Sequence, residues 1–173
     1  MKIFKERLIN NTKGFTFLEL LIVMGIISLL FTFTLISYKG VQANARDTQR
    51  KNDLKQYQTL LETQANANGG FYPGRSTTAR ASDVGTPPIS LCADLGISDC
   101  PYDPADGVNN CKSGLCRYFY QSNGTCDNGT DCGSRFVLYS RLEKVNNYFI
   151  VCSSGISGEK VNTTTFTAGA CPL

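Results

Sequence analysis

The run KGFTFLELLIVMGIISLLFTFTLISY, residues 13–38, sets the architecture of this 173-residue chain. It opens with a basic residue followed by Gly14, and its next charge is Glu19, five residues past that glycine. Residues 20–38 carry no charge at all, and such a length is enough to span a bilayer as a helix. A carboxylate at the edge of so apolar a segment is costly, so Glu19 is treated as a functional residue by default.

The segment ahead of this run is short and basic. Residues 1–14 hold four basic residues and one acidic residue, and such an excess favours retention on the cytoplasmic side of a membrane. A secretory signal peptide would be cut after its apolar stretch, at small residues. An ordinary uncleaved signal anchor is the alternative interpretation.

Residues 8–38 resemble the N-terminus of type IV pilins and the related pseudopilins. In that family a basic leader ends in glycine, and the mature chain then begins with Phe-Thr-Leu-like residues and has glutamate at its fifth position. Here Gly14, Phe15 and Glu19 occupy those places. The resemblance implies that a prepilin peptidase at the cytoplasmic face cuts between Gly14 and Phe15. It also implies that a methyltransferase activity then N-methylates the new Phe15 amine.

Glu19 is the predicted assembly residue. In a bundle of helices without water its carboxylate needs a cation, and the amine of Phe15 on a neighbouring subunit is the nearest candidate. We expect residues 20–36 to hold the subunit in the membrane first and to pack in a fibre later. The alternative is that Glu19 lies at headgroup depth and reaches the water.

The helical pattern continues well beyond the apolar segment. Leu54, Tyr57 and Leu61 recur at helical spacing, with Leu60 beside them, and form one apolar stripe. Gly69-Gly70 then provides a stop. The helix is predicted to run for about 50 residues, or on the order of 75 Å.

A mixed run of charges lies on this helix between the apolar segment and the stripe. We interpret it as a solvated helix face, with contact to a neighbouring subunit as the alternative. DNA is a less favoured partner, because the basic residues are interleaved with acidic ones. The run comprises Arg46, Asp47, Arg50, Lys51, Asp53 and Lys55.

All eight cysteines fall in the C-terminal half. An even number of cysteines behind a membrane-targeting N-terminus predicts four disulfides formed outside the cytoplasm. A zinc site is disfavoured because the chain has no Cys-x-x-Cys and no histidine. Eight cysteines allow 105 pairings, and short separation alone favours Cys92–Cys100, Cys111–Cys116, Cys126–Cys132 and Cys152–Cys171.

The C-terminal half reads as loops followed by strands. Residues 71–115 are rich in turn-forming residues and are expected to be mostly loop. Residues 116–121, 135–142 and 147–152 are β-branched or aromatic and are predicted to be antiparallel strands. The fold class is therefore α+β and pilin-like, a small sheet packed on the long helix. The expected organisation is leader 1–14, transmembrane and filament-core helix 15–38, amphipathic continuation 39–70, and disulfide-rich head 71–173.

No cofactor is expected, and calcium is the alternative. Asp127 and Asp131 lie in a cysteine-bounded turn that superficially resembles a calcium loop, and major pseudopilins bind calcium through loop acids. The full acidic pattern that ends in glutamate is absent here, and a closed turn explains the same residues. An enzyme is disfavoured because the usual general base, histidine, is missing and no phosphate loop appears.

The expected function is that of a structural subunit of a type IV pilus-like surface filament, serving adhesion, twitching motility or DNA uptake. Its expected partners are copies of itself, other (minor) pilins, a membrane assembly platform, and the membrane before assembly. One alternative is a pseudopilin of a type II secretion-like system, favoured by Tyr72-Pro73 and Asp103-Pro104, which resemble that subfamily. The other alternative is a membrane-anchored binding module that never polymerises.

Overall fold

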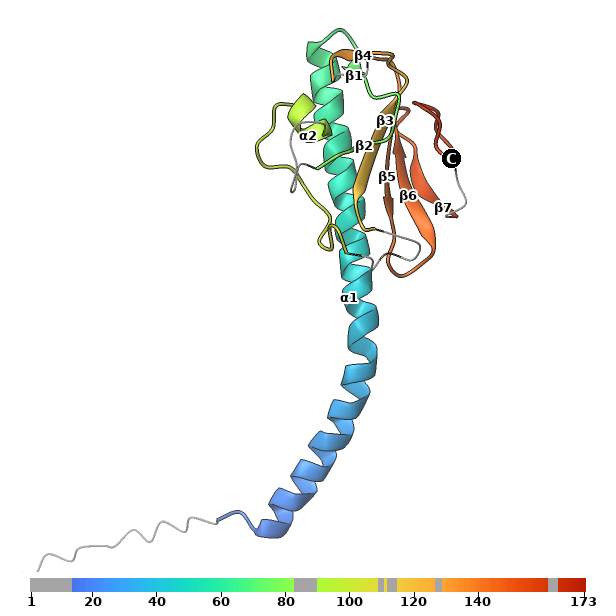
Figure 1. The fold of residues 1–173 in the computed structure, drawn as a ribbon. Coiled ribbons are helices and arrows are strands. Elements are labelled where there is room, and N and C mark those ends of the chain that lie inside the picture. The colour runs from blue at the N-terminus through green and yellow to red at the C-terminus, as the bar shows by residue number, and fades with distance from the viewer. Residues whose placement is uncertain (1–13, 83–89, 109–110, 112–114, 127–128, 162–164) are drawn as a thin grey trace, which may run out of the picture. The chain divides into compact units, whose positions relative to one another are not determined.

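The computed structural model describes residues 14–82, 90–108, 111, 115–126, 129–161 and 165–173. The chain forms two compact units, Met1–Lys39 and Gly40–Leu173. Helix α1, Phe17–Ala67, supplies residues to both units (Figure 1). Most of the expected leader, residues 1–13, lies outside the described residues.

In the first unit, α1 presents apolar side chains that no described residue covers. The large apolar side chains between Phe17 and Phe33 are 50% to 77% exposed. Within the part of the chain that the structure describes, no helical segment combines the length and mean hydropathy of a membrane span.

The second unit contains a five-stranded antiparallel sheet with strand order β2-β3-β5-β6-β7 (Figure 1). A separate two-stranded ribbon joins β1 to β4, and the short helix α2 follows a Ser90 cap. The elements are β1 (Tyr72–Pro73), β2 (Ala79–Arg80), α2 (Leu91–Asp94), β3 (Tyr118–Ser122), β4 (Asp131–Gly133), β5 (Phe136–Arg141), β6 (Asn147–Cys152) and β7 (Ser157–Val161).

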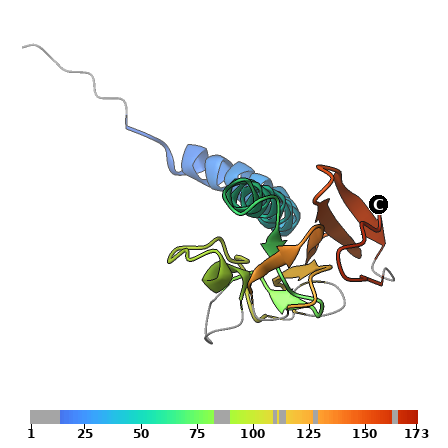
Figure 2. The same cartoon turned by 90° about the horizontal axis from the view of Figure 1, so that it is seen from above.

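The main core lies between α1 and one face of this sheet (Figure 2). The predicted stripe is confirmed, because Leu54, Tyr57 and Leu61 are fully buried there. They pack with inward side chains of the strands, which include Tyr118 and Phe136. The Tyr57 hydroxyl donates to the Pro101 carbonyl at 2.7 Å, so the stripe also fixes the loop that precedes β3.

A second apolar cluster lies on the other face of the sheet. It contains Tyr139, Tyr148 and Ile150, and the C-terminal segment adds Phe166 to it. The ring of Phe166 stacks on that of Tyr139 with centroids 3.6 Å apart. The C-terminal segment is therefore packed against the sheet.

The three predicted strands are confirmed as β3, β5 and β6, but the prediction of a three-stranded sheet is wrong. Strands β2 and β7 extend it on both sides. Strand β7, whose sequence is SGEKV, is almost wholly exposed, so no alternation of apolar and polar residues marks it. Strand β2 has only two residues, too few for any sequence period to show.

All eight cysteines are paired in disulfides. The bonds join neighbours along the chain, as short separation favoured. Cys92–Cys100 closes the α2 segment, and Cys152–Cys171 ties the C-terminal segment to the end of β6.

Candidate processing and assembly site

The peptide bond expected to be cut lies just ahead of α1. Residues 14–16 are not helical, and the Phe15 side chain is 89% exposed. A Cβ built on Gly14 would meet no atom within 4 Å. Packing against the described residues therefore gives no reason for glycine at position 14.

The first turn of α1 is closed by a capping box formed by Thr16 and Glu19. The Thr16 backbone N–H and hydroxyl both donate to Glu19 Oε2, at 2.9 and 2.8 Å. In return the Glu19 backbone N–H donates to Thr16 Oγ1 at 3.2 Å. Thr at the N-cap and Glu at the third helical position satisfy two backbone donors reciprocally. Our sequence analysis missed the role of Thr16, although the spacing Thr-x-x-Glu is a known signal of a helix start.

This geometry leaves one oxygen of Glu19 available. Both capping hydrogen bonds end on Oε2, and among the described residues Oε1 has no hydrogen-bond partner. The carboxylate also lies beside the helix N-terminus, where negative charge is favoured. A further donor could therefore approach Oε1 without breaking the cap.

The charged run of α1 is not a uniformly solvated face. That interpretation is wrong for the buried Asp47 and Arg50, whereas Lys55 is exposed. Arg50 is fully buried and forms a two-pronged ion pair with Asp103, with both N–O distances at 2.8 Å. Its third nitrogen lies 2.6 Å from Asp47 and 3.3 Å from Glu143. Arg46 completes the network with a 2.6 Å contact to Glu143. The charges hold α1 to the loop at Asp103 and to the β5–β6 turn.

The sequence could not reveal this network. Asp103 and Glu143 lie 53 and 93 positions from Arg50, and no local spacing connects them. An arginine flanked by acids on a helix also occurs on solvated surfaces. The packed loop and turn supply two of the three acids that contact Arg50, and Asp47 of α1 supplies the third.

Of the two calcium candidates, the structure describes only Asp131. The Asp131 carboxylate accepts hydrogen bonds from the side-chain amides of Gln64 and Asn68, at 3.0 and 2.5 Å. It therefore ties β4 to the end of α1. Asp127 lies outside the described residues, and no cluster of potential metal ligands occurs among those that are described.

Residues 9–36 match the family model of the prokaryotic N-terminal methylation motif. The chain carries the class III signal of type IV pilins and pseudopilins. This methylation motif includes the Gly14–Phe15 bond and the capping box of Thr16 and Glu19. No curated protein and no solved structure matches the chain significantly. The methylation motif therefore identifies the N-terminal segment, and everything after residue 36 is interpreted from geometry.

Proposed function

We propose that this chain is a structural subunit of a type IV pilus-like surface filament. The observation that carries the proposal is the methylation motif over residues 9–36, with Glu19 at the fifth position after Gly14. The motif supports a type IV pilin-like or pseudopilin-like protein that a prepilin peptidase processes, and proteins of this kind are structural rather than enzymatic. The pilus itself, with adhesion, twitching motility or DNA uptake as its use, is our more specific proposal.

The exposed apolar start of α1 explains why such a subunit would lie first in a membrane and then in a bundle of helices. Apolar side chains exposed over the whole of residues 17–33 need a cover, and large exposed apolar surfaces mark interaction sites. In this proposal the cytoplasmic membrane provides that cover first, with the basic leader inside. Helices of neighbouring subunits provide it in the surface filament, together with minor pilins and a membrane assembly platform.

Register in the filament is assigned to Glu19. Cleavage at Gly14–Phe15 creates an amine one residue ahead of the Thr16 cap. In the assembled bundle, the Phe15 amine of one subunit pairs with Glu19 of the next. A charge pair withdrawn from water is sensitive to geometry, since an unpaired partner is strongly penalised. One such pair therefore fixes a sliding apolar interface.

Processing and release are tested by the intact mass and N-terminal sequence of the protein sheared from the cell surface. We expect a chain that starts at methylated Phe15. Its mass should be lower than that of the reduced chain by two hydrogens for each of the four disulfides. A chain that retains Met1 and occurs only in membranes contradicts the filament and leaves the non-polymerising, membrane-anchored binding module.

Assembly is tested by Glu19→Gln. Glutamine also serves at the third position of a capping box, so this variant keeps the helix start and loses only the charge. We expect processed subunits in the membrane and no fibres. Thr16→Ala is the matched control, because it removes the cap and keeps the Glu19 charge. Fibres from Glu19→Gln at the wild-type level would contradict the charge pair.

A pseudopilin of a type II secretion-like system is the second candidate. Tyr72-Pro73 and Asp103-Pro104 favour it, and in the structure Asp103 anchors the loop after α2 through Arg50. Long surface fibres in overexpressing cells support the pilus. Loss of protein secretion on deletion, without surface fibres in the wild type, supports the pseudopilin.

A further inference from the structure

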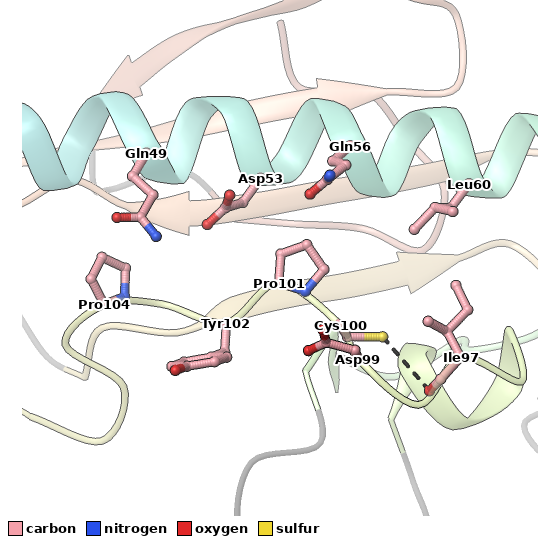
Figure 3. Close-up of a pocket in the computed structure, with 10 residues that line it drawn as sticks. All are labelled: Gln49, Asp53, Gln56, Leu60, Ile97, Asp99, Cys100, Pro101, Tyr102 and Pro104. Carbon is pink, nitrogen blue, oxygen red and sulfur yellow. Dashed lines mark hydrogen bonds between the residues drawn. The ribbon is translucent and has the colours of Figure 1, made fainter.

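A groove of about 700 Å³ lies within the second unit, between α1 and the loop that follows α2 (Figure 3). Gln49, Asp53, Gln56 and Leu60 enter it from one face of α1. The opposite wall comes from residues 97–104 and includes Asp99 and Tyr102. Tyr102 is 54% exposed, so its ring is open to a ligand.

The groove carries negative charge without a cation. None of the described residues that line it is basic. Asp53 accepts a 2.6 Å hydrogen bond from the Tyr118 hydroxyl through Oδ2, but no described residue forms an ion pair with it. The nearby guanidinium of Arg50 is already bound to Asp47, Asp103 and Glu143. Asp99 likewise has no ion pair with any described residue.

Partial burial of the Asp53 carboxylate costs free energy, because its charge loses contact with water. Burial raises the pKa of Asp53 above its ordinary value, which shows that its charge is poorly solvated. The Tyr118 hydrogen bond opposes that shift only in part. An incoming cation would offset this desolvation.

The lining specifies the chemistry of the occupant. Two carboxylates and two side-chain amides offer acceptors, and an exposed aromatic ring attracts cations through its face. Apolar walls from Leu60, Ile97 and the prolines suit the aliphatic stem of a long side chain. Together these features fit a lysine or arginine side chain.

We propose that this groove receives a basic side chain from a second copy of the chain. Residues 15–173 are formally neutral, so every copy of the chain carries as many bases as acids. Lys55 follows Asp53 by two positions on α1, where side chains do not face each other. Arg135 and Lys144, one at each end of β5, are exposed and form no ion pair with a described residue.

The groove and these two bases lie on different parts of the unit. The α2 segment adjoins the β2 edge of the sheet, where Arg80 bridges to Ser90. Arg135 directly precedes β5, whereas Lys144 lies in the β5–β6 turn, where its backbone N–H donates to Asp47 of α1. A site and its complement on different surfaces of one chain make a heterologous contact, which propagates as an open helical filament. The inference rests on the proposed filament and names a contact between its heads.

The test is charge reversal with rescue in the full chain, scored by fibres sheared from cells. We expect Asp99→Lys to lower the fibre yield about tenfold or more, since a like-charge contact opposes docking. Lys144→Glu or Arg135→Glu alone should lower it similarly. Asp99→Lys should then be combined in one chain with the reversal of the base that docks in the groove. This double variant should restore fibres, because every copy carries both the reversed groove and the reversed base, and the two attract again.

Two controls separate folding from docking. Ser98→Lys adds one positive charge beside the groove and removes no lining acid, and Asp99→Asn makes the same change in net charge by removing one. Fibre loss with Asp99→Asn and not with Ser98→Lys supports the groove. The mass of each processed subunit, read without reduction, shows whether all four disulfides have formed.

The outcomes distinguish this inference from the proposed function. If the wild type makes no fibres, the filament proposal fails. If Glu19→Gln leaves fibres intact, the charge pair at Glu19 fails and the filament stands. If those variants behave as expected and Asp99→Lys fibres equal the wild type, only the groove contact is overturned. The groove contact is overturned as well if neither double variant restores fibres. It is also overturned if a free lysine-rich peptide occupies the groove and assembly is unchanged.

Discussion

Arg50 is the residue on which the packing of α1 against the head depends most. Its side chain is fully buried and satisfied by Asp103, Asp47 and Glu143, so a truncation leaves Asp103 charged and buried without a cation. Arg50→Met is expected to lower the free energy of unfolding by about 3–5 kcal/mol. Urea unfolding followed by tyrosine circular dichroism measures it, since the chain has no tryptophan.

The control for Arg50 is Arg46→Ala in the same helix. The Arg46 side chain is 31% exposed, and ion pairs that remain open to water contribute about 0–1 kcal/mol. Equal losses in the two variants would contradict the assignment of the buried arginine as the principal anchor.

Glu143 should make the head sensitive to acid. The hydrogen bond from Arg46, assisted by Arg50, holds the pKa of Glu143 below its ordinary value of 4.5. A lowered folded pKa adds stability above the unfolded value and loses it as the pH falls through the folded one. We expect wild-type stability to fall below about pH 4.5. Glu143→Gln should be less stable at neutral pH and show a smaller fall, measured by urea unfolding at stepwise pH.

The contribution of Asp53 to the pH dependence of stability should have the opposite sign to that of Glu143. Its pKa is raised by burial, so its charge costs stability at any pH above that raised value. Asp53→Asn keeps an acceptor for the Tyr118 hydroxyl and removes the charge. The variant should be at least as stable as the wild type at pH 7, and the difference should vanish in acid. A clear loss at pH 7 would show that Asp53 already has a cation within the monomer.

At the scale of elements, the ribbon of β1 and β4 depends on two glycines packed on a disulfide. A Cβ on Gly74 or on Gly124 would lie 2.6 Å from the Cys132 sulfur. Gly74→Ala must therefore move the Cys126–Cys132 bridge, and overpacking of this kind costs about 1–3 kcal/mol. Gly40→Ala on α1 is the control, because its Cβ would meet nothing within 4 Å. Thermal unfolding should separate the two variants, and equal melting temperatures would contradict the contact.

The elements that the sequence predicted are those with a strong local signal. The stripe of Leu54, Tyr57 and Leu61 and the aromatic strands β3, β5 and β6 bury their apolar residues, so hydrophobic pattern and structure agree. Strand β7 forms because its backbone pairs with β6 over five residues, Ser157–Val161. Backbone hydrogen bonds leave no trace in side-chain composition, which is why β7 was missed.

At the scale of the whole molecule, four disulfides cross-link loops and the C-terminal segment within the head. The Cys152–Cys171 bond closes 19 positions and Cys111–Cys116 closes five, so chain entropy predicts losses of about 3 and about 2 kcal/mol when each pair is replaced by serine. The Cys152→Ser/Cys171→Ser variant should also release Phe166 from Tyr139 and expose aromatic surface. Thermal unfolding and binding of a hydrophobic dye measure the two effects. A larger loss from the Cys111 pair would contradict the ranking.

The sequence by itself indicated the methylation motif, the apolar start of α1 and the disulfides. The methylation motif, the uncharged helix and the even set of cysteines are contiguous or compositional signals, and short separation was enough to favour the observed disulfide pairs. The tertiary structure decided the rest. Arg50 became a buried anchor because Asp103 and Glu143 are brought to it by folding. The groove at Asp53 and Asp99 exists only because the loop after α2 packs beside α1. A charged residue exposed to water and one buried under a loop look the same in the sequence. Only the fold determines how well each of them is solvated.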